Sequence, residues 1–120
     1  MADREPVPVL FWQAIEARAW RAVEALLAPD FVSEWPQSGE VFDRATFILV
    51  NQMYPGDWHL RVVKVVEAGH DLVTEVEVSI DDRLDRAVSF FELRDGAIIK
   101  LREYWPEPFP IPEWRRALHR

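Results

Sequence analysis

Hydrophobic and polar positions change their spacing about halfway along the chain. From about Glu5 to Leu27 the apolar residues recur every three or four positions, which predicts one long helix. Ala28-Pro29-Asp30 is expected to end this helix, because proline cannot continue the hydrogen-bond ladder. A second helix is expected from Asp43, as its N-cap, to Met53 or Tyr54.

Alternating apolar and polar residues predict strands in the rest of the chain. A short strand is expected over residues 31–35, and four longer ones over 58–67, 72–80, 87–94 and 97–104. Asp95-Gly96 suits the positive φ angles of a tight hairpin turn, and Asp81-Asp82-Arg83 is expected to form the preceding turn. Helices followed by a meander of strands predict an α+β fold with an antiparallel sheet, formed by residues 1–120 as one domain.

Composition and charge limit the classes of partner. The chain has 14 Lys and Arg residues against 21 Asp and Glu residues, a net charge of −7, so nucleic acid is not an expected partner. It has no cysteine, and its three histidines lack metal-ligand spacing, so no cofactor or metal is expected. No apolar run could span a bilayer, and the segment MADREPVP does not resemble a signal peptide. A cytoplasmic protein with no membrane partner is expected.

The last expected strand carries the candidate chemistry. Leu101, Glu103 and Trp105 share one face of this strand, so Glu103 is expected to point inward among apolar side chains. Loss of hydration raises the pKa of such a carboxyl group, and a Glu with a raised pKa can act as a general acid or base. The alternative is a structural ion pair between Glu103 and an arginine, such as Arg61 or Arg83.

Two further acids, Glu75 and Glu77, lie on the strand over residues 72–80. They alternate with the apolar residues of that strand, so they are expected to face solvent. A curved sheet that buries both of its faces would instead bring one of them close to Glu103. Two acids could then share a proton, which makes Glu75 and Glu77 secondary catalytic candidates.

Large aromatic residues occur on several different expected elements. If the fold brings them together, they would line a pocket for a flat or hydrophobic small molecule. The alternative for each of them is ordinary core packing. The candidate ligand-binding residues are the aromatic Trp12, Trp35, Trp58, Phe91 and Trp105, with Asn51, Tyr54 and His59 as polar anchors.

The chain resembles the nuclear transport factor 2-like superfamily, and in particular its SnoaL-like branch, which is similar to ketosteroid isomerase and limonene epoxide hydrolase. The resemblance is carried by FWQAIEARAWRAVEALLAPDFV, SEWPQSGE, NQMYPG and FFELRDGAIIKLREYWP, which together cover almost the whole chain. It implies a cone, in which a curved antiparallel sheet wraps around helices and leaves one buried pocket. It also implies a homodimer.

The resemblance assigns roles to particular positions. The isomerases have a base carboxylate just before the proline of the early strand, where this chain has Trp35. The epoxide hydrolases and some cyclases have an acid before the aromatic pair of the last strand, where this chain has Glu103. The hydrolases also use an Arg-X-Asp pair on a middle strand, and Glu75-Val76-Glu77 is taken as its nearest match.

Three functions are compatible with these features, and the sequence favours the first of them, because the catalytic patterns of the superfamily are each broken in this chain. The protein could bind a small hydrophobic molecule, or it could be a cofactor-independent isomerase, cyclase or hydrolase that uses Glu103 as general acid/base. It could also be a dimerisation module with a filled core. An open cavity lined by Glu103 and one more titratable group would favour the enzyme, whereas a lining of Trp and Leu alone would favour the binder.

Overall fold

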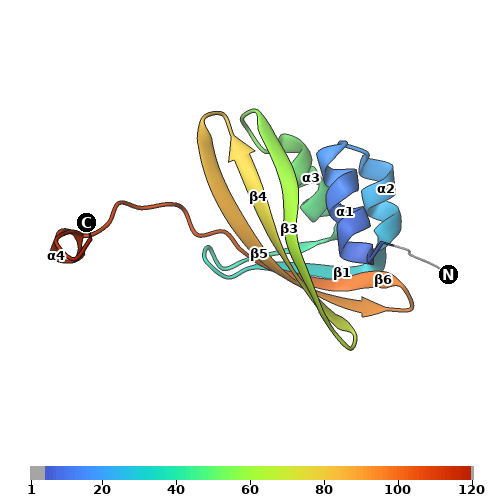
Figure 1. The fold of residues 1–120 in the computed structure, drawn as a ribbon. Helices are drawn as coiled ribbons and strands as arrows, with labels where there is room; N and C mark the ends of the chain where they lie inside the picture. Colours follow the sequence, from blue (N-terminus) through green and yellow to red (C-terminus); the bar gives the residue numbers. More distant parts are fainter. Residues whose placement is uncertain (1–4, 120) are drawn as a thin grey trace.

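The computed structural model describes residues 5–119, which form a bent six-stranded sheet with helices packed against its concave face (Figure 1). The helices are α1 (Val7–Glu16), α2 (Trp20–Leu26), α3 (Arg44–Met53) and the short α4 (Glu113–Arg116). The strands are β1 (Leu27–Trp35), β2 (Glu40–Asp43), β3 (Trp58–Ala68), β4 (Asp71–Ile80), β5 (Arg83–Arg94) and β6 (Ala97–Tyr104). The predicted α+β fold with a curved sheet is therefore confirmed.

The N-terminal helix is not continuous as predicted, because it breaks between α1 and α2. Arg18 has a φ angle of 55° in the left-handed region. Its N–H donates to the Ile15 carbonyl oxygen at 3.0 Å, and the N–H of Ala19 donates to the Ala14 carbonyl oxygen at 2.9 Å. This pair of bonds is the Schellman motif, which glycine usually closes. Arginine takes its place here, so the sequence carries no visible stop signal.

The second correction concerns Pro29, which lies inside β1 and not at the end of a helix. β1 begins at Leu27, and its register with β6 shifts between Leu27 and Val32, where the proline is accommodated. β2 was not predicted, because four residues are too few to show an alternating pattern. Asp43 is the N-cap of α3 as expected, since its Oδ1 accepts a hydrogen bond from the Thr46 N–H at 2.8 Å.

The strands follow the order β2-β1-β6-β5-β4-β3 across the sheet. All neighbouring pairs are antiparallel except β1 and β6, which run parallel, and no local pattern predicted that exception. The β5–β6 hairpin turns at Asp95 and Gly96 with φ angles of 52° and 81°, which confirms the predicted tight turn. The parallel pair places Glu34 opposite Arg102, so the next residue of each strand, Trp35 and Glu103, are also neighbours.

An aromatic core holds α1 and α3 against the concave face of the sheet. Phe11 of α1 stacks on Phe47 of α3 with ring centroids 6.1 Å apart. It also meets Phe91 of β5 edge-on at 5.5 Å, and all three side chains are buried. This core fixes the orientation of α1 and of the end of α3, and both helices thereby contribute side chains to the cavity described below.

The chain after β6 leaves the body of the protein and ends in α4 at a distance from the sheet (Figure 1). The large apolar side chains of this segment have no cover, since Phe109, Trp114 and Leu118 are 73%, 71% and 73% exposed. Residues 106–119 therefore form an arm that contributes little to the core.

No described helix is long and apolar enough to cross a membrane. Residues 1–4, which begin the segment examined for a signal peptide, lie outside the described residues, as does residue 120. The cytoplasmic location remains a prediction.

Candidate functional site

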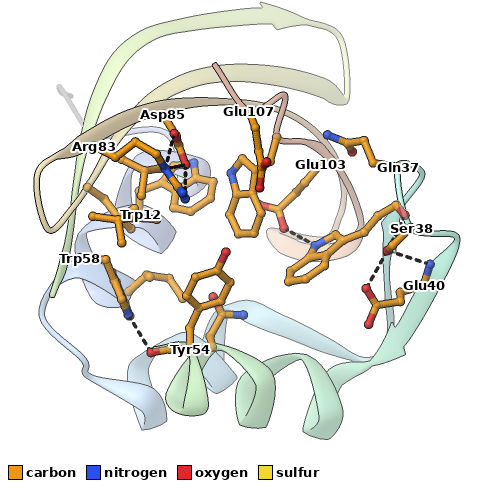
Figure 2. Close-up of a pocket in the computed structure, with 17 residues that line it drawn as sticks. Trp12, Gln37, Ser38, Glu40, Tyr54, Trp58, Arg83, Asp85, Glu103 and Glu107 are labelled. Carbon is orange, nitrogen blue, oxygen red and sulfur yellow. Dashed lines mark hydrogen bonds and ion pairs between the residues drawn. The ribbon is translucent and has the colours of Figure 1, made fainter. Parts of the chain in front are cut away.

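A cavity of about 380 Å³ opens on the concave side of the sheet (Figure 2). Its wall is built by α1, the end of α3, the turn before β2, and strands β1 and β3 to β6. Figure 2 shows the labelled side chains arranged around this space, from Trp12 and Trp58 on one side to Ser38 and Glu40 on the other. A volume of this size is typical of pockets for small molecules.

The structure brings together six of the eight side chains expected to bind a ligand. Phe91 is an exception, because it is 1% exposed and packs in the aromatic core. His59 is the other, because it points outward and its Nδ1 lies 2.8 Å from Glu16 Oε2. The six that line the cavity are Trp12, Trp35, Asn51, Tyr54, Trp58 and Trp105.

Glu103 of β6 lies in the cavity wall and is only 3% exposed. Its Oε1 accepts a hydrogen bond from Trp35 Nε1 at 2.9 Å, and its Oε2 lies 3.3 Å from the Ser89 hydroxyl, which donates to it. Burial raises the pKa of Glu103 to about 7, and the two hydrogen bonds offset only part of this rise. Near neutral pH the group can therefore give up a proton or take one.

The alternative of a structural ion pair for Glu103 does not describe this structure. Arg61 Nη2 lies 2.6 Å from Glu77 Oε1 on the outer face of the sheet. Arg83 pairs with Asp85 instead, with 2.9 Å between Arg83 Nη2 and Asp85 Oδ2. Within residues 5–119, no Lys, Arg or His side chain makes a salt bridge with Glu103.

Glu75 and Glu77 lie on the outer face of β4, away from the cavity. Arg86 contacts both carboxylates, at 3.4 Å for Glu75 and 3.2 Å for Glu77. The solvent-facing expectation from strand alternation is confirmed, whereas the suggested approach of these acids to Glu103 is corrected. The sheet separates the two groups, so a proton shared between them has no structural basis.

Asp85 is the second buried acid of the cavity, and it was not among the predicted site residues. Arg83 Nε donates to both of its carboxylate oxygens, at 2.9 Å and 3.1 Å. The sequence does contain a pattern that identifies Asp85, because Arg83-Leu84-Asp85 matches the Arg-X-Asp pair for which Glu75-Val76-Glu77 was taken as the nearest match. The predicted turn over residues 81–83 concealed this match, whereas the observed turn contains only two residues and β5 begins at Arg83.

Asp85 and Glu103 lie at different depths of the same cavity. Glu103 is paired in register with Ser89, and Asp85 lies four residues before Ser89 on the same face of β5. At about 3.3 Å per residue, the two positions are separated by roughly 13 Å along the strand. Backbone positions this far apart do not place the two acids to share a proton.

The mouth of the cavity is polar and mostly exposed. It is lined by Arg83, by Glu107 after β6, by Gln37 and Ser38 of the turn before β2, and by Glu40 at the start of β2. The Ser38 hydroxyl donates to Glu40 Oε1 at 2.6 Å. No group of described His, Asp and Glu side chains is arranged to hold a metal ion. The charged and hydrogen-bonding side chains of the mouth are thus available to contact a ligand directly.

Replacing Glu103 by Gln is expected to remove a pH dependence of stability. The unfolded chain loses this proton near the ordinary pKa of 4.5, whereas the folded protein keeps it up to about pH 7. The stabilisation is therefore fully present below pH 4.5 and is lost as the pH rises through 7, a change of about 3 kcal/mol. The free energy of unfolding in urea should therefore increase by this amount for Glu103→Gln, relative to the unchanged protein, when the pH is raised from about 4 to about 8.

Glu92→Gln is the matched control, because Glu92 is an exposed acid on β5. Its stability should follow that of the unchanged protein at every pH. Parallel curves for Glu103→Gln and the unchanged protein would show that Glu103 titrates normally.

Solved structures and a family model give relatives of this chain. A protein from Kribbella flavida, provisionally named a ketosteroid isomerase, is 32% identical, with 95% of this chain and 85% of that chain covered and a TM-score of 0.86. An NTF-2 like protein of unknown function from Burkholderia xenovorans is 27% identical, with 95% and 91% covered and a TM-score of 0.79. The search of curated proteins finds no significant match.

A more distant relative shares the fold alone. An LEH-like epoxide hydrolase from M. tuberculosis is 21% identical, with 83% of this chain and 80% of that chain covered and a TM-score of 0.67. The family model described as SnoaL-like domain matches residues 10–101, which is most of the chain. The resemblance found in the sequence is therefore confirmed, and the protein belongs to the SnoaL-like family of the nuclear transport factor 2-like superfamily.

Proposed function

We propose that this protein is a cofactor-independent enzyme that binds a small, mainly apolar molecule and transfers a proton to or from it through Glu103. One observation carries the proposal: a carboxyl group that is 3% exposed lies in the wall of an open cavity and makes no salt bridge within residues 5–119. Burying such a group costs folding free energy. A pKa of about 7 matches the working pH of a general acid or base.

The rest of the cavity supports a bound substrate in a fixed orientation. Aromatic rings from α1, β1 and β3 and from Trp105, which follows β6, offer apolar surface along its wall. Arg83, Asp85 and Tyr54 lie among its polar residues and can hold a hydrogen-bonding group of the substrate. In this arrangement the mouth positions the molecule, and Glu103 meets an atom at the inner end.

The residue at the position of the isomerase base indicates which group transfers the proton. That position is Trp35, and an indole ring cannot abstract a proton. Its N–H instead donates to Glu103, so Glu103 is the group that remains for proton transfer. Isomerisation, cyclisation and hydrolysis of small apolar molecules all include such a transfer, and a single carboxyl group can supply it.

Binding without chemistry is the second candidate function. It is favoured by the aromatic share of the wall, where Trp12, Trp35, Tyr54, Trp58 and Trp105 all contribute. Such rings would hold an apolar ligand without help from a titratable group. The presence of Glu103 and Asp85 in the same wall favours the enzyme.

For any compound that the protein converts, Glu103→Gln is expected to lower kcat by about a hundredfold or more with little change in KM. The amide keeps the shape of the side chain but cannot exchange a proton. A screen of small cyclic ketones, epoxides and alcohols, followed by steady-state kinetics, measures this. If Glu103 acts as a base, the activity of the unchanged protein falls below about pH 7, and if it acts as an acid, the activity falls above it.

Glu77→Gln is the control for the loss of one carboxylate elsewhere on the sheet, because Glu77 lies on β4 and faces away from the cavity. It should keep full turnover. A Glu103→Gln protein that turns over its substrates at an unchanged rate would exclude Glu103 as the general acid or base, whereas an unchanged protein that converts none of the compounds it binds would leave the binder.

Filling the cavity is expected to prevent binding in either case. Val78 lines the cavity from β4, so Val78→Phe places a ring in the space that a ligand would occupy. Val73→Phe adds the same ring to the outer face of β4, where Val73 pairs with Phe90. Titration with the neutral dye N-phenyl-1-naphthylamine should show at least about tenfold weaker binding for Val78→Phe alone. Equal affinities for both variants would place the ligand outside this cavity.

We also infer that the protein is a homodimer. Its radius of gyration is 15.9 Å, whereas a compact chain of this length has about 13.6 Å, because the arm after β6 does not fold back. Phe109, Trp114 and Leu118 of that arm are exposed, and so are Phe90 and Tyr104 on the outer face of the sheet. Apolar surface of this extent is typical of an interface between chains.

Light scattering at micromolar concentration is expected to give twice the 14.1 kDa mass of one chain. Trp114→Ala should raise the dissociation constant of the dimer if the arm takes part, because it removes the largest exposed ring of the arm. A mass of one chain at the same concentration would contradict the dimer.

A further inference from the structure

We propose that the molecule bound in this cavity is a protonated amine with an apolar body, whose ammonium group lies at the mouth. The inference rests on the proposed function only in requiring that a small molecule occupies the cavity. What it adds is the charge of that molecule and the end of the cavity that recognises the charge.

The first support is the excess of acids in the lining. Glu40, Asp85, Glu103 and Glu107 line the cavity, and Arg83 is the only Lys or Arg among the described lining residues. Arg83 is committed to Asp85 through Nε and Nη2. A carboxylate ligand would be repelled by the remaining acids, and an ammonium group would be attracted. The apolar wall strengthens this effect by lowering the local dielectric constant.

The second support is that three of the lining tryptophans have already donated their indole N–H groups to the protein. The bonds run from Trp12 Nε1 to Thr74 Oγ1 at 3.0 Å, from Trp35 Nε1 to Glu103 Oε1 at 2.9 Å, and from Trp58 Nε1 to the Tyr54 carbonyl oxygen at 3.3 Å. What these rings offer to a ligand is their π surface. Such surface attracts organic cations and is indifferent to hydrogen-bond acceptors.

Several other polar groups of the lining also have their donors occupied or covered. The Asn51 amide nitrogen donates to the Phe47 carbonyl oxygen at 2.8 Å, and the Ser38 hydroxyl donates to Glu40. Trp105 Nε1 is buried and has no partner among the described residues, so a ligand does not reach it. The donors that remain in the described lining include the Tyr54 hydroxyl and the Gln37 amide, against four carboxyl groups, so a ligand that brings its own N–H groups improves the pairing.

The mouth suits the ammonium group better than the inner end does. Glu40 and Glu107 are exposed, so an ammonium group beside either carboxylate keeps part of its hydration. The inner end is lined by aromatic rings, and an ion moved there would lose more hydration than Glu103 alone restores. The apolar body then extends inward along the rings, and Glu103 remains free to exchange a proton with it.

A matched set of probes tests the charge of the ligand. We choose 3-phenylpropylamine, 3-phenylpropan-1-ol and 3-phenylpropanoate, which differ mainly in the charge of one end. An alkylamine of this kind is protonated at neutral pH, as lysine is with a pKa of about 10.4. Calorimetric titration at neutral pH should show the amine binding about tenfold more tightly than the alcohol, and the carboxylate more weakly than both.

Two charge variants place the ammonium group. Glu107→Gln is expected to reduce the preference for the amine over the alcohol by about threefold to fivefold, because it removes a carboxylate at the mouth. Glu92→Gln removes the same charge from an exposed position on β5 that does not line the cavity, and should leave the preference unchanged. Val78→Phe should weaken all the binding that is observed, which shows that the probes enter the cavity.

The outcomes separate this inference from the proposed function. If the alcohol binds as tightly as the amine and Val78→Phe blocks it, the amine is excluded while the proposed function stands. If Glu92→Gln reduces the preference as much as Glu107→Gln does, the charge of the whole surface is responsible and the inference fails. If none of the three probes binds at millimolar concentration, the inference fails. The titration with N-phenyl-1-naphthylamine then tests separately whether the cavity binds a small molecule.

Discussion

The site depends on the way in which the protein holds the carboxyl group of Glu103 without a cation. Trp35 and Ser89 donate one hydrogen bond each, so the side chain has a fixed position in the cavity wall. Both donors are neutral, and they offset only part of the desolvation that raises its pKa to about 7. An arginine at the same distance would fix the position equally well, but it would keep the group ionised at all relevant pH values. Neutral donors are therefore what leaves the proton exchangeable.

This arrangement requires the parallel pairing of β1 with β6. The two strands are far apart in sequence, and between them the chain forms α3 and the other strands of the sheet. Only when β1 lies beside the last strand does Trp35 reach Glu103, while Ser89 reaches it from β5 on the opposite side. The aromatic core around Phe11 and Phe47 holds the helices against the same face of the sheet. The catalytic candidate is thus positioned by the whole fold and not by a local motif.

Much of this was visible in the sequence wherever the cause was local. Strand alternation placed Glu103 inside and Glu77 outside, and the Asp95-Gly96 turn followed from backbone preference alone. The features that were not predicted depend on contacts between residues that are distant in the sequence or on where a strand begins. The helix break at Arg18 is held by the guanidinium group, which lies 3.4 Å from the centre of the Trp58 ring and donates to the Trp58 carbonyl oxygen at 2.6 Å. Asp85 was not predicted as a site residue because the expected turn was one residue too long, and the burial of Asp85 depends on where β5 begins.

The two ends of the cavity respond differently to the solvent, and this difference favours a division of tasks between them. The carboxylates at the mouth are exposed, so dissolved salt screens their attraction for a ligand. Glu103 is covered by protein, so its pKa is set by its surroundings and changes little with salt. Since roughly 13 Å separates Asp85 from Glu103 along the strands, one group of a molecule can be recognised at the mouth while another meets the inner acid. Affinity and proton transfer can therefore be altered independently by substitutions at the two ends.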